Sequence, residues 1–408
     1  MKCPAKGLRI RPGSTHPPFD YQDGNKEEGF VKTYTSKERV LAALNHQEAD
    51  RVPIDFGGIN NSTIHYKIQN MLLEHLGYEP VGTGLIKSQS QQVVVIDERI
   101  LKHFESDTRS IYLDESHAWM QPKKGEYIDH FGLGYVDDDN LNFRSHLSSP
   151  LINATTVEEI LEYKMPNPRA QRIVAGLKEQ CETYKDKALV LDGLRGGAFE
   201  LVSWIRGITT FYMDLLIDKE LAKVMIDKVV EYEMELVSFA HEELGDAIDI
   251  IKCADDLGTQ ISTIISEELY VELIKPAQAR LYSHIRKTFK KAKLLLHCCG
   301  SIRPFIPHFI EIGVDAINPV QISAVNMDPQ KLKDDFGDRL TFWGGGIDTQ
   351  VTLPMGTPKE VATEVKRNIE IFKPGGGYVF ATVHNITPGV PLENILALFE
   401  SYKKNCIY

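Results

Sequence analysis

The 408-residue chain has no long apolar run and no secretory signal. Its apolar runs, such as residues 294–296, are a few residues long, whereas a membrane-spanning helix needs about 20. The N-terminus carries several basic residues, but no apolar segment follows them, as a secretory signal would require. We therefore expect a cytoplasmic protein.

Cysteine and positive charge are also scarce. The 6 cysteines in 408 residues do not make a disulfide framework. Acidic residues outnumber basic ones by 57 to 46, a formal charge of −11, which argues against a general binder of nucleic-acid backbones. The hydrophobic share of 42% and charged share of 25% are typical of a globular enzyme. This length suits one large barrel with insertions, or two domains.

Strand and helix patterns alternate along most of the chain. Residues 1–35 are polar and turn-rich, so we expect an N-terminal extension there. Short apolar runs predict strands, and a helical pattern follows each of the last five. Eight such units predict an α/β fold, a (β/α)₈ TIM barrel over residues 36–408. The predicted strands cover residues 51–58, 107–113, 188–192, 249–256, 293–297, 314–318, 340–344 and 378–382.

The spacing between the first and third predicted strands is too long for simple βα units. Residues 125–136 alternate on either side of a glycine-containing turn, which is typical of a hairpin. We therefore predict a hairpin insertion over residues 115–150, near the mouth of the barrel.

Polar side chains occur at the ends of the predicted strands. Because TIM barrels carry their catalytic groups at the C-terminal ends of the strands, this pattern indicates an active site. The residues concerned are Asp55, Asp192, Asp255, His297, Asn318 and His384.

Three of the residues near these strand ends are candidate metal ligands. His297 and Cys299 are two residues apart, a spacing at which both side chains can point to one place. His384 follows the eighth predicted strand, which opens on the same face of the barrel. Two nitrogen ligands, one sulfur ligand and an open position are the composition of a catalytic zinc site. The residues alone equally allow a core histidine beside a small buried thiol, with His384 an ordinary polar strand-end residue.

Carboxylates and glycines form a further set of candidates. Glu200 and Asp256, or its neighbour Asp255, could transfer protons or supply a fourth metal ligand. Glu200 could equally be a helix-start charge. Gly344, Gly345 and Gly346 lack the ending of a phosphate-binding loop, but they could let a flat cofactor approach the backbone closely.

Several segments resemble the uroporphyrinogen decarboxylase-like superfamily. The first is residues 35–53, which open with Thr-Ser-Lys-Glu-Arg-Val-Leu and close with Asp-Arg-Val-Pro. The others are residues 297–302, 313–321, 342–348 and 384–395. The resemblance extends over residues 35–405, and it implies a TIM barrel.

Two branches of this superfamily differ in their motifs. The decarboxylase branch grips the carboxylates of a tetrapyrrole with arginines after Arg-Val-Pro, and residues 54–62 contain no arginine. The cobamide-dependent methyltransferase branch uses a His-x-Cys…Cys zinc motif, whose first two positions match His297 and Cys299. The third position is His384 instead of cysteine. This exchange removes a negative charge from the zinc shell and makes the metal a stronger Lewis acid.

The resemblance therefore implies a zinc- and corrinoid-dependent methyltransferase of an anaerobic system. It would demethylate a small substrate, a methoxylated aromatic compound, and pass the methyl group to the Co(I) cobamide of a partner corrinoid protein. A partner is implied because the chain has no Asp-x-His-x-x-Gly segment for holding its own cobamide. The oligomeric state is open, a homodimer included. Candidate contacts for an aryl ring are Tyr66, Tyr112, Phe131, Trp204 and Trp343.

Other functions remain open at this stage. The methyl donor could be a methylamine, a thioether or a folate, and the enzyme could be a methylcobamide:thiol or folate methyltransferase. A decarboxylase of the uroporphyrinogen type, a corrinoid-independent lyase and a non-catalytic binder of corrinoid or tetrapyrrole are the alternatives from other classes.

Overall fold

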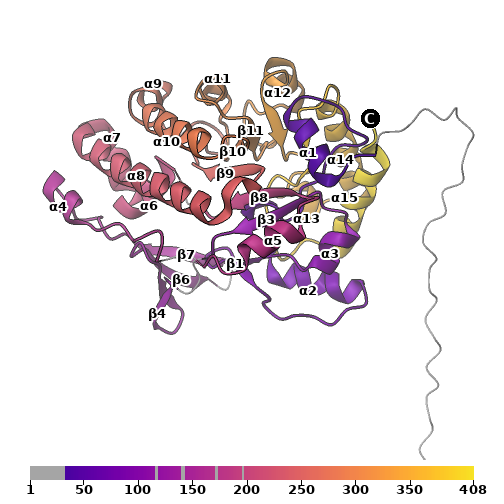
Figure 1. Ribbon diagram of the computed structural model, residues 1–408, viewed down its shortest axis with the longest axis horizontal. Helices are drawn as coiled ribbons and strands as arrows, with labels where there is room; N and C mark the ends of the chain where they lie inside the picture. The colour runs from indigo at the N-terminus through magenta and orange to yellow at the C-terminus, as the bar shows by residue number, and fades with distance from the viewer. Residues whose placement is uncertain (1–32, 115–117, 139–142, 171–172, 195–196) are drawn as a thin grey trace, which may run out of the picture. The chain divides into compact units, whose positions relative to one another are not determined.

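A ring of parallel strands organises the computed structural model, which describes residues 33–114, 118–138, 143–170, 173–194 and 197–408 (Figure 1). Seven strands form one sheet in the order β13-β12-β11-β10-β9-β8-β3, and every neighbouring pair is parallel. This sheet confirms the predicted TIM-barrel class. Its strands are β3 (Thr108–Tyr112), β8 (Ala188–Asp192), β9 (Ile250–Ala254), β10 (Lys293–His297), β11 (Ala316–Asn318), β12 (Thr341–Trp343) and β13 (Tyr378–Val379).

Helices surround the strands, and the helices predicted after the last five strands are confirmed. In α14 the residues Val361, Val365, Ile369 and Phe372 recur at helical spacing and are buried against the sheet side of the molecule. The described helices are α1 (Ser36–Leu44), α2 (Tyr66–His75), α3 (Glu98–His103), α4 (Val157–Glu162), α5 (Leu177–Thr183), α6 (Glu200–Arg206), α7 (Ile208–Ile217), α8 (Lys219–Leu244), α9 (Glu267–Leu269), α10 (Lys275–Thr288), α11 (Ile306–Glu311), α12 (Pro329–Phe336), α13 (Thr352–Met355), α14 (Pro358–Phe372) and α15 (Leu392–Asn405).

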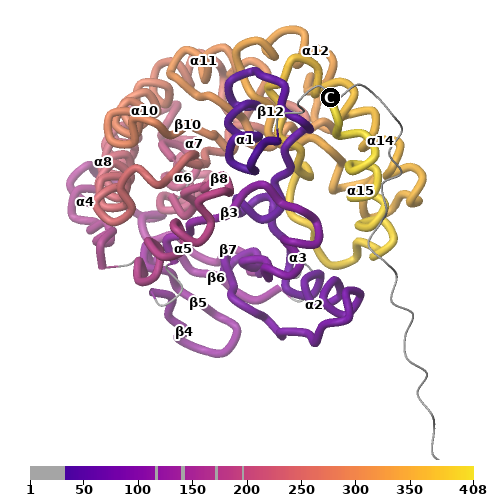
Figure 2. The backbone as a smooth tube through the Cα atoms, turned by 45° about the vertical axis from the view of Figure 1, so that its right-hand side comes forward, coloured from indigo at the N-terminus to yellow at the C-terminus, as the bar shows by residue number. Residues whose placement is uncertain are grey.

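The first predicted strand, residues 51–58, has a different form in the structure. Only isolated bridges occur there, because Pro53 has no N–H to donate to a ladder. The segment still closes the ring between β13 and β3. Asp55 N donates to Phe380 O at 2.8 Å, Phe380 N donates to Pro53 O at 2.8 Å, and Asp107 N donates to Ile54 O at 2.9 Å. In Figure 2 the indigo start of the described chain accordingly lies beside its yellow end.

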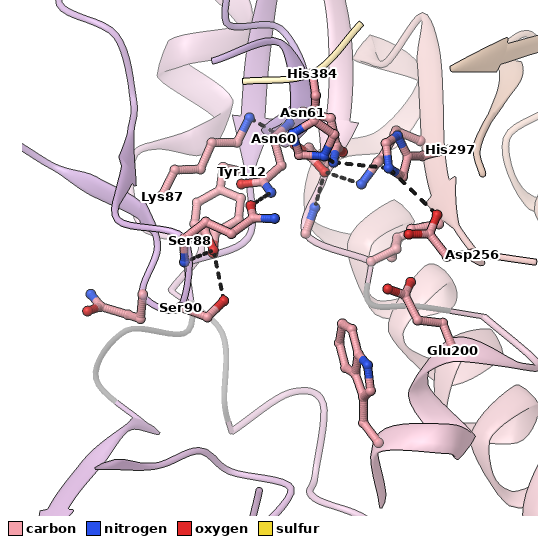
Figure 3. Close-up of a pocket in the computed structure, with 18 of the residues that line it drawn as sticks. Asn60, Asn61, Lys87, Ser88, Ser90, Tyr112, Glu200, Asp256, His297 and His384 are labelled. Atoms are coloured by element: carbon pink, nitrogen blue, oxygen red, sulfur yellow. Dashed lines mark hydrogen bonds and ion pairs between the residues drawn. The ribbon is translucent and has the colours of Figure 1, made fainter. Parts of the chain in front are cut away.

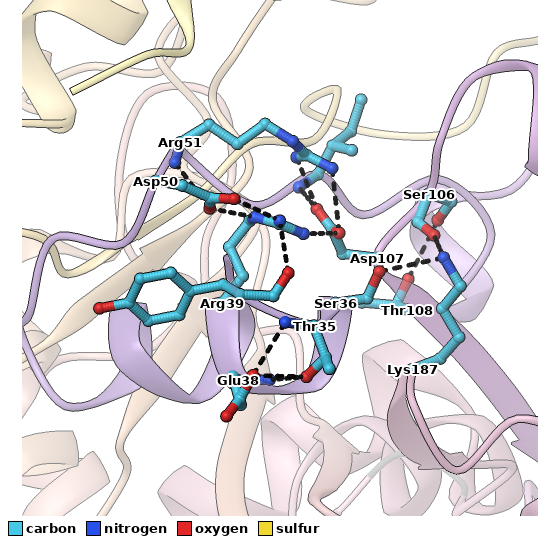
Figure 4. Close-up of polar contacts among 12 residues, drawn as sticks. Thr35, Ser36, Glu38, Arg39, Asp50, Arg51, Ser106, Asp107, Thr108 and Lys187 are labelled. Carbon is cyan, nitrogen blue, oxygen red and sulfur yellow. Dashed lines mark hydrogen bonds and ion pairs between the residues drawn. The ribbon is translucent and has the colours of Figure 1, made fainter. Parts of the chain in front are cut away.

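Asp107 anchors this closing segment (Figure 4). Its fully buried carboxylate lies 2.7 Å from both the Arg39 and the Arg51 guanidinium groups. It also accepts a hydrogen bond from Ile54 N at 2.9 Å. Arg39 makes a second ion pair with Asp50 at 2.6 Å. These contacts tie α1 and the closing segment to the start of β3.

The insertion near the mouth is larger than the predicted hairpin. The hairpin itself is confirmed, since β5 (Glu126–Ile128) pairs antiparallel with β6 (Gly134–Asp138). Asp129 Oδ1 accepts hydrogen bonds from Phe131 N and Leu133 N, which fixes the turn. β4 (Met120–Lys123) and β7 (Phe143–Ser148) complete a four-stranded sheet. A second hairpin, β1 (Ile86–Ser88) and β2 (Val93–Val94), was not predicted.

Almost all of the predicted N-terminal extension, namely residues 1–32, lies outside the described residues. The helix that follows begins at Ser36, because Thr35 caps α1 and forms a capping box with Glu38. Among the described helices, none is both long and apolar enough to cross a membrane.

We predict that Asp107→Ala lowers the free energy of unfolding by about 3–5 kcal/mol, because it leaves buried guanidinium charge without its partner. Chemical denaturation followed by circular dichroism measures this change. The matched control is Asp338→Ala, whose carboxylate is mostly exposed beside Arg339 and whose removal should change stability by less than about 0.5 kcal/mol. Equal effects of the two substitutions would contradict the anchoring role of Asp107.

Candidate active site

A cavity of about 160 Å³ lies among the C-terminal ends of the barrel strands (Figure 3). Side chains from the barrel, the loops that follow its strands and the β1–β2 hairpin line it together. Among them are Lys252 and Ala254 from β9, His297 from β10, Glu200 and Trp204 from α6, and His384 from the loop after β13.

The three predicted metal ligands lie close together, and two of them, His297 and His384, line this cavity. One ligand atom each of His297, Cys299 and His384 lies within 4.8 Å of the others. Cys299 Sγ is 3.3 Å from His297 Nε2. His384 comes from a distant part of the chain, and it reaches the other two ligands because the ends of the barrel strands share one face. Two imidazoles and one thiol form a donor set that suits zinc.

The orientation of the His297 ring is set by Asn318. Asn318 Nδ2 donates to Trp343 O at 2.9 Å, so its Oδ1 is the atom that faces His297 Nδ1 at 2.6 Å. Because this oxygen can only accept, Nδ1 carries the proton and Nε2 carries the lone pair. The lone pair of His297 is thereby directed to the place where Cys299 and His384 meet.

Asn61, which the sequence analysis missed, lies between the two imidazoles. Its Nδ2 is 3.1 Å from His297 Nε2 and 3.2 Å from His384 Nε2, so its amide donates to both lone pairs. Asn61 Oδ1 is buried and has no hydrogen-bond partner among the described residues. A metal cation would engage the same two lone pairs, and a turn of the amide would give it the unpaired oxygen. The residues present therefore fit a metal ion.

Burial keeps the donor atoms of this site uncharged. It lowers the pKa of His297 to about 3, with a further contribution from Lys252. It lowers the pKa of His384 to about 4, with a further contribution from His297. Burial, and then the neighbouring Asp256 carboxylate, raise the pKa of the Cys299 thiol. At neutral pH both imidazoles thus present lone pairs, while the thiol releases a proton only when a cation binds.

Two of the three predicted carboxylates line the cavity, and the third positions one of them. Glu200 and Asp256 both line the cavity. Asp256 Oδ1 accepts a hydrogen bond from Cys299 N at 2.8 Å, and burial raises the pKa of its carboxyl. Asp255 lies outside the cavity wall and accepts hydrogen bonds from Phe199 N and Glu200 N at 2.9 and 2.7 Å. Asp255 therefore positions the start of α6, and with it Glu200.

The opposite wall of the cavity carries a group of three charges. Asp192 lies 2.8 Å from the Lys87 ammonium and 3.7 Å from that of Lys252. Burial alone would raise the pKa of Asp192, but the two lysines outweigh it and bring the pKa to about 2. The sequence analysis missed both lysines. Lys252 left a signal, because it interrupts the apolar run of a strand predicted to be buried.

The predicted aromatic contacts are only partly at the cavity. Tyr112 and Trp204 line it, as does Trp119, which the sequence analysis did not single out. Tyr66, Phe131 and Trp343 are not part of its wall.

The predicted cofactor-binding glycines lie elsewhere. Gly344, Gly345 and Gly346 are buried and do not line the cavity. A Cβ on Gly346 would overlap the ring of Phe380. In the structure these glycines let the end of β12 pack closely against the segment after β13, and their positions give no support to cofactor contact.

The profile of the uroporphyrinogen decarboxylase (URO-D) family matches residues 137–405. The chain belongs to the URO-D family. Its relatives include the methylcobamide:CoM methyltransferase MtbA of Methanosarcina acetivorans, 23% identical over 67% of this chain and 76% of that protein. A uroporphyrinogen decarboxylase of Vesicomyosocius okutanii is 20% identical over 46% of this chain and 51% of that protein. The predicted resemblance to this superfamily and to its methyltransferases is confirmed.

A solved structure supports the fold. A methyltransferase from Methanosarcina mazei superposes with a TM-score of 0.66 and 17% identity. The superposition covers 91% of this chain and 99% of the other.

The depressed histidine pKa values predict a pH dependence of stability. The imidazoles bind protons with an ordinary pKa of 6.5 in the unfolded chain, but only near 3 and 4 when folded. Protons therefore favour the unfolded state, and the free energy of unfolding of chelator-treated protein should fall by a few kcal/mol between pH 6.5 and 4. Denaturant titrations at several pH values measure this slope.

The variant His384→Gln should flatten this slope, since it removes one of the two groups. The control His75→Gln changes an exposed histidine on α2 and should leave the slope as it is. The same slope in all three proteins would contradict the burial argument.

Proposed function

We propose that this URO-D family member is a zinc-dependent methyltransferase that moves a methyl group from a methoxylated aromatic compound to the Co(I) cobamide of a partner corrinoid protein. The observation that carries the proposal is the cluster of two unprotonated imidazole nitrogens and one thiol, whose two histidines line a small cavity with aromatic walls. The methylcobamide methyltransferases among the relatives support the corrinoid-dependent part of the reaction.

His297, Cys299 and His384 would hold the zinc ion, with the unpaired oxygen of Asn61 beside them. When bound, zinc supplies a Lewis acid for the ether oxygen of the substrate. A shell of one thiolate and two neutral imidazoles carries less negative charge than a shell with two thiolates. This difference favours the activation of an oxygen over the activation of a thiol.

Asp256 has the properties of the proton donor. Burial raises the pKa of its carboxyl, so the acid holds its proton more firmly than an exposed aspartate. Transfer of the methyl carbon to the cobalt nucleophile leaves the C–O bond electrons on the aryl oxygen. A proton from Asp256 converts that aryl oxide into the neutral phenol.

The size and walls of the cavity favour a single aromatic ring. Cavities of about 150 Å³ hold benzene in other proteins, and this one is about 160 Å³. Trp119, Trp204 and Tyr112 provide aromatic surface around it. A tetrapyrrole is much larger, which argues against the decarboxylase alternative.

A second candidate is the transfer of a methyl group from methylcobamide to a thiol. The names of the methanogen relatives, which are methylcobamide:CoM methyltransferases, favour it. The charge of the donor set favours the first candidate, and the methyl-transfer assay below separates the two.

We predict that protein purified without oxygen contains stoichiometric zinc, and that Cys299→Ala and His384→Ala lose it. Cys298→Ala is the matched control, because its thiol is fully buried and accepts a hydrogen bond from Leu257 N instead of facing the cavity. Elemental analysis after dialysis measures the metal. The site is wrongly assigned if the control loses as much zinc as the two variants.

We further predict that the enzyme forms methylcobalamin from Co(I) cobalamin and a methoxybenzoate, which its absorption spectrum reports. Cys299→Ala should lower kcat/KM beyond the about 10–100-fold that changes around a metal shell cause, and Cys298→Ala should not. Formation of methylcobalamin from none of a panel of methoxyarenes, together with demethylation of methylcobalamin by 2-mercaptoethanesulfonate, would favour the second candidate instead.

A further inference from the structure

Lys252 is a surplus cation in the wall of the cavity. Its side chain is only 6% exposed, and it lines the cavity. Its ammonium lies 3.7 Å from Asp192 Oδ1 and makes no hydrogen bond among the described residues. A buried ammonium with open donor positions needs an acceptor, because burial without one is costly.

Asp192 is already satisfied without Lys252. Its Oδ2 is 2.8 Å from the Lys87 ammonium and accepts a hydrogen bond from Asn60 N at 2.5 Å. Its Oδ1 accepts a hydrogen bond from Gly193 N at 2.9 Å. Lys87 therefore balances the negative charge of Asp192. The positive charge of Lys252 remains as the net charge of these three side chains.

The other acids of the cavity do not take up this charge. Glu200 and Asp256 share the cavity with Lys252. Asp256 attracts Lys252 electrostatically, but the structure has no ion pair within 4.0 Å between Lys252 and either acid among the described residues. Lys252 thus faces the cavity with its donors available.

The strand geometry fixes where Lys252 lies relative to the candidate metal site. Lys252, Ala254 and Asp256 alternate along one strand and its extension, and all three line the cavity. Ala254 pairs in register with His297, and Lys252 pairs two positions deeper, with Leu295. At about 3.3 Å per residue, Lys252 starts about 7 Å below the level of His297. The backbone of Lys252 thus lies deeper in the barrel than that of His297, and both side chains line the cavity from different levels.

We propose that Lys252 binds the carboxylate of the substrate, so that the substrate class is a methoxybenzoate whose ring spans the cavity and whose methoxy group faces His297, Cys299 and His384. This inference rests on the proposed function and makes its substrate class specific. A carboxylate satisfies the free ammonium donors, and the aromatic walls contact the ring between the two polar ends. A neutral methoxyarene would leave the ammonium unsatisfied.

Equilibrium binding separates this inference from the catalytic proposal. Calorimetry with the zinc-loaded enzyme should give a Kd for 4-methoxybenzoate that is at least ~10-fold lower than that for methoxybenzene, since hydrogen bonds to charged groups contribute that much. Lys252→Gln should raise the Kd of 4-methoxybenzoate by at least ~10-fold and leave that of methoxybenzene within ~2-fold. Lys252→Arg should retain most of the preference for the carboxylate.

The matched control is Lys187→Gln. Lys187 is also partly buried, but its ammonium donates to Ser36 Oγ and Ser106 O outside this cavity, so its loss should leave both Kd values unchanged. Circular dichroism establishes that each variant folds. The comparison of the two ligands on the unaltered enzyme tests the inference even if Lys252→Gln does not fold.

Equal affinity of the unaltered enzyme for the two ligands would overturn the inference, as would an equal loss of both in Lys252→Gln. A Lys252-dependent affinity for 2-mercaptoethanesulfonate without one for 4-methoxybenzoate would assign the subsite to a sulfonate and overturn the carboxylate. Lys252-dependent binding of 4-methoxybenzoate without methylcobalamin formation would support the subsite while the proposed function fails.

Discussion

The closing of the barrel depends on the buried Asp107 carboxylate. The segment between β13 and β3 contains Pro53, which has no N–H to donate, so backbone hydrogen bonds alone would hold this part of the ring weakly. Asp107 accepts a hydrogen bond from Ile54 N, the residue after this proline, and its carboxylate forms ion pairs with Arg39 and Arg51. The chain then continues directly into the loop that carries Asn61. The contacts of Asn61 with both imidazoles therefore depend on an ionic network at the opposite end of the barrel.

Exclusion of water governs the chemistry of the candidate site. Burial lowers the pKa of His297 and His384 and raises that of Cys299 and Asp256, so each of these groups tends toward its neutral form. The wall around Asp192 is the exception, because Lys87 and Lys252 keep that carboxylate ionised. One cavity thus combines a neutral donor set with a fixed cation. This division suits a ligand with one charged end and one uncharged end.

The sequence allowed prediction of the features that depend on local pattern. Buried strands appear as short apolar runs, and helices such as α14 appear as a period of 3.6, so the barrel could be predicted. His297, Cys299 and His384 were found because strand ends of a barrel share one face. Asn61 and Lys87 were missed because Asn61 lies in a single 3-10 turn and Lys87 in the three-residue strand β1. The placement of such short elements depends on contacts with distant residues, such as the hydrogen bond that Asn385 donates to Asn60 O. The surroundings of Gly344, Gly345 and Gly346 could not be predicted, because a glycine run does not show whether the space beside it is open or packed.

The adjacent cysteines differ in surroundings although they are neighbours in the chain. Cys298 is packed in the core, whereas Cys299 faces His297. An insertion of one residue in β10 would move Cys298 into the place of Cys299 and so keep a sulfur atom there. The same change would turn His297 into the core and bring Leu296 into its place. The register of this strand is therefore set by the position of the imidazole and not by that of the thiol, and a chain that gained one residue there would keep a cysteine at this place but lose the site.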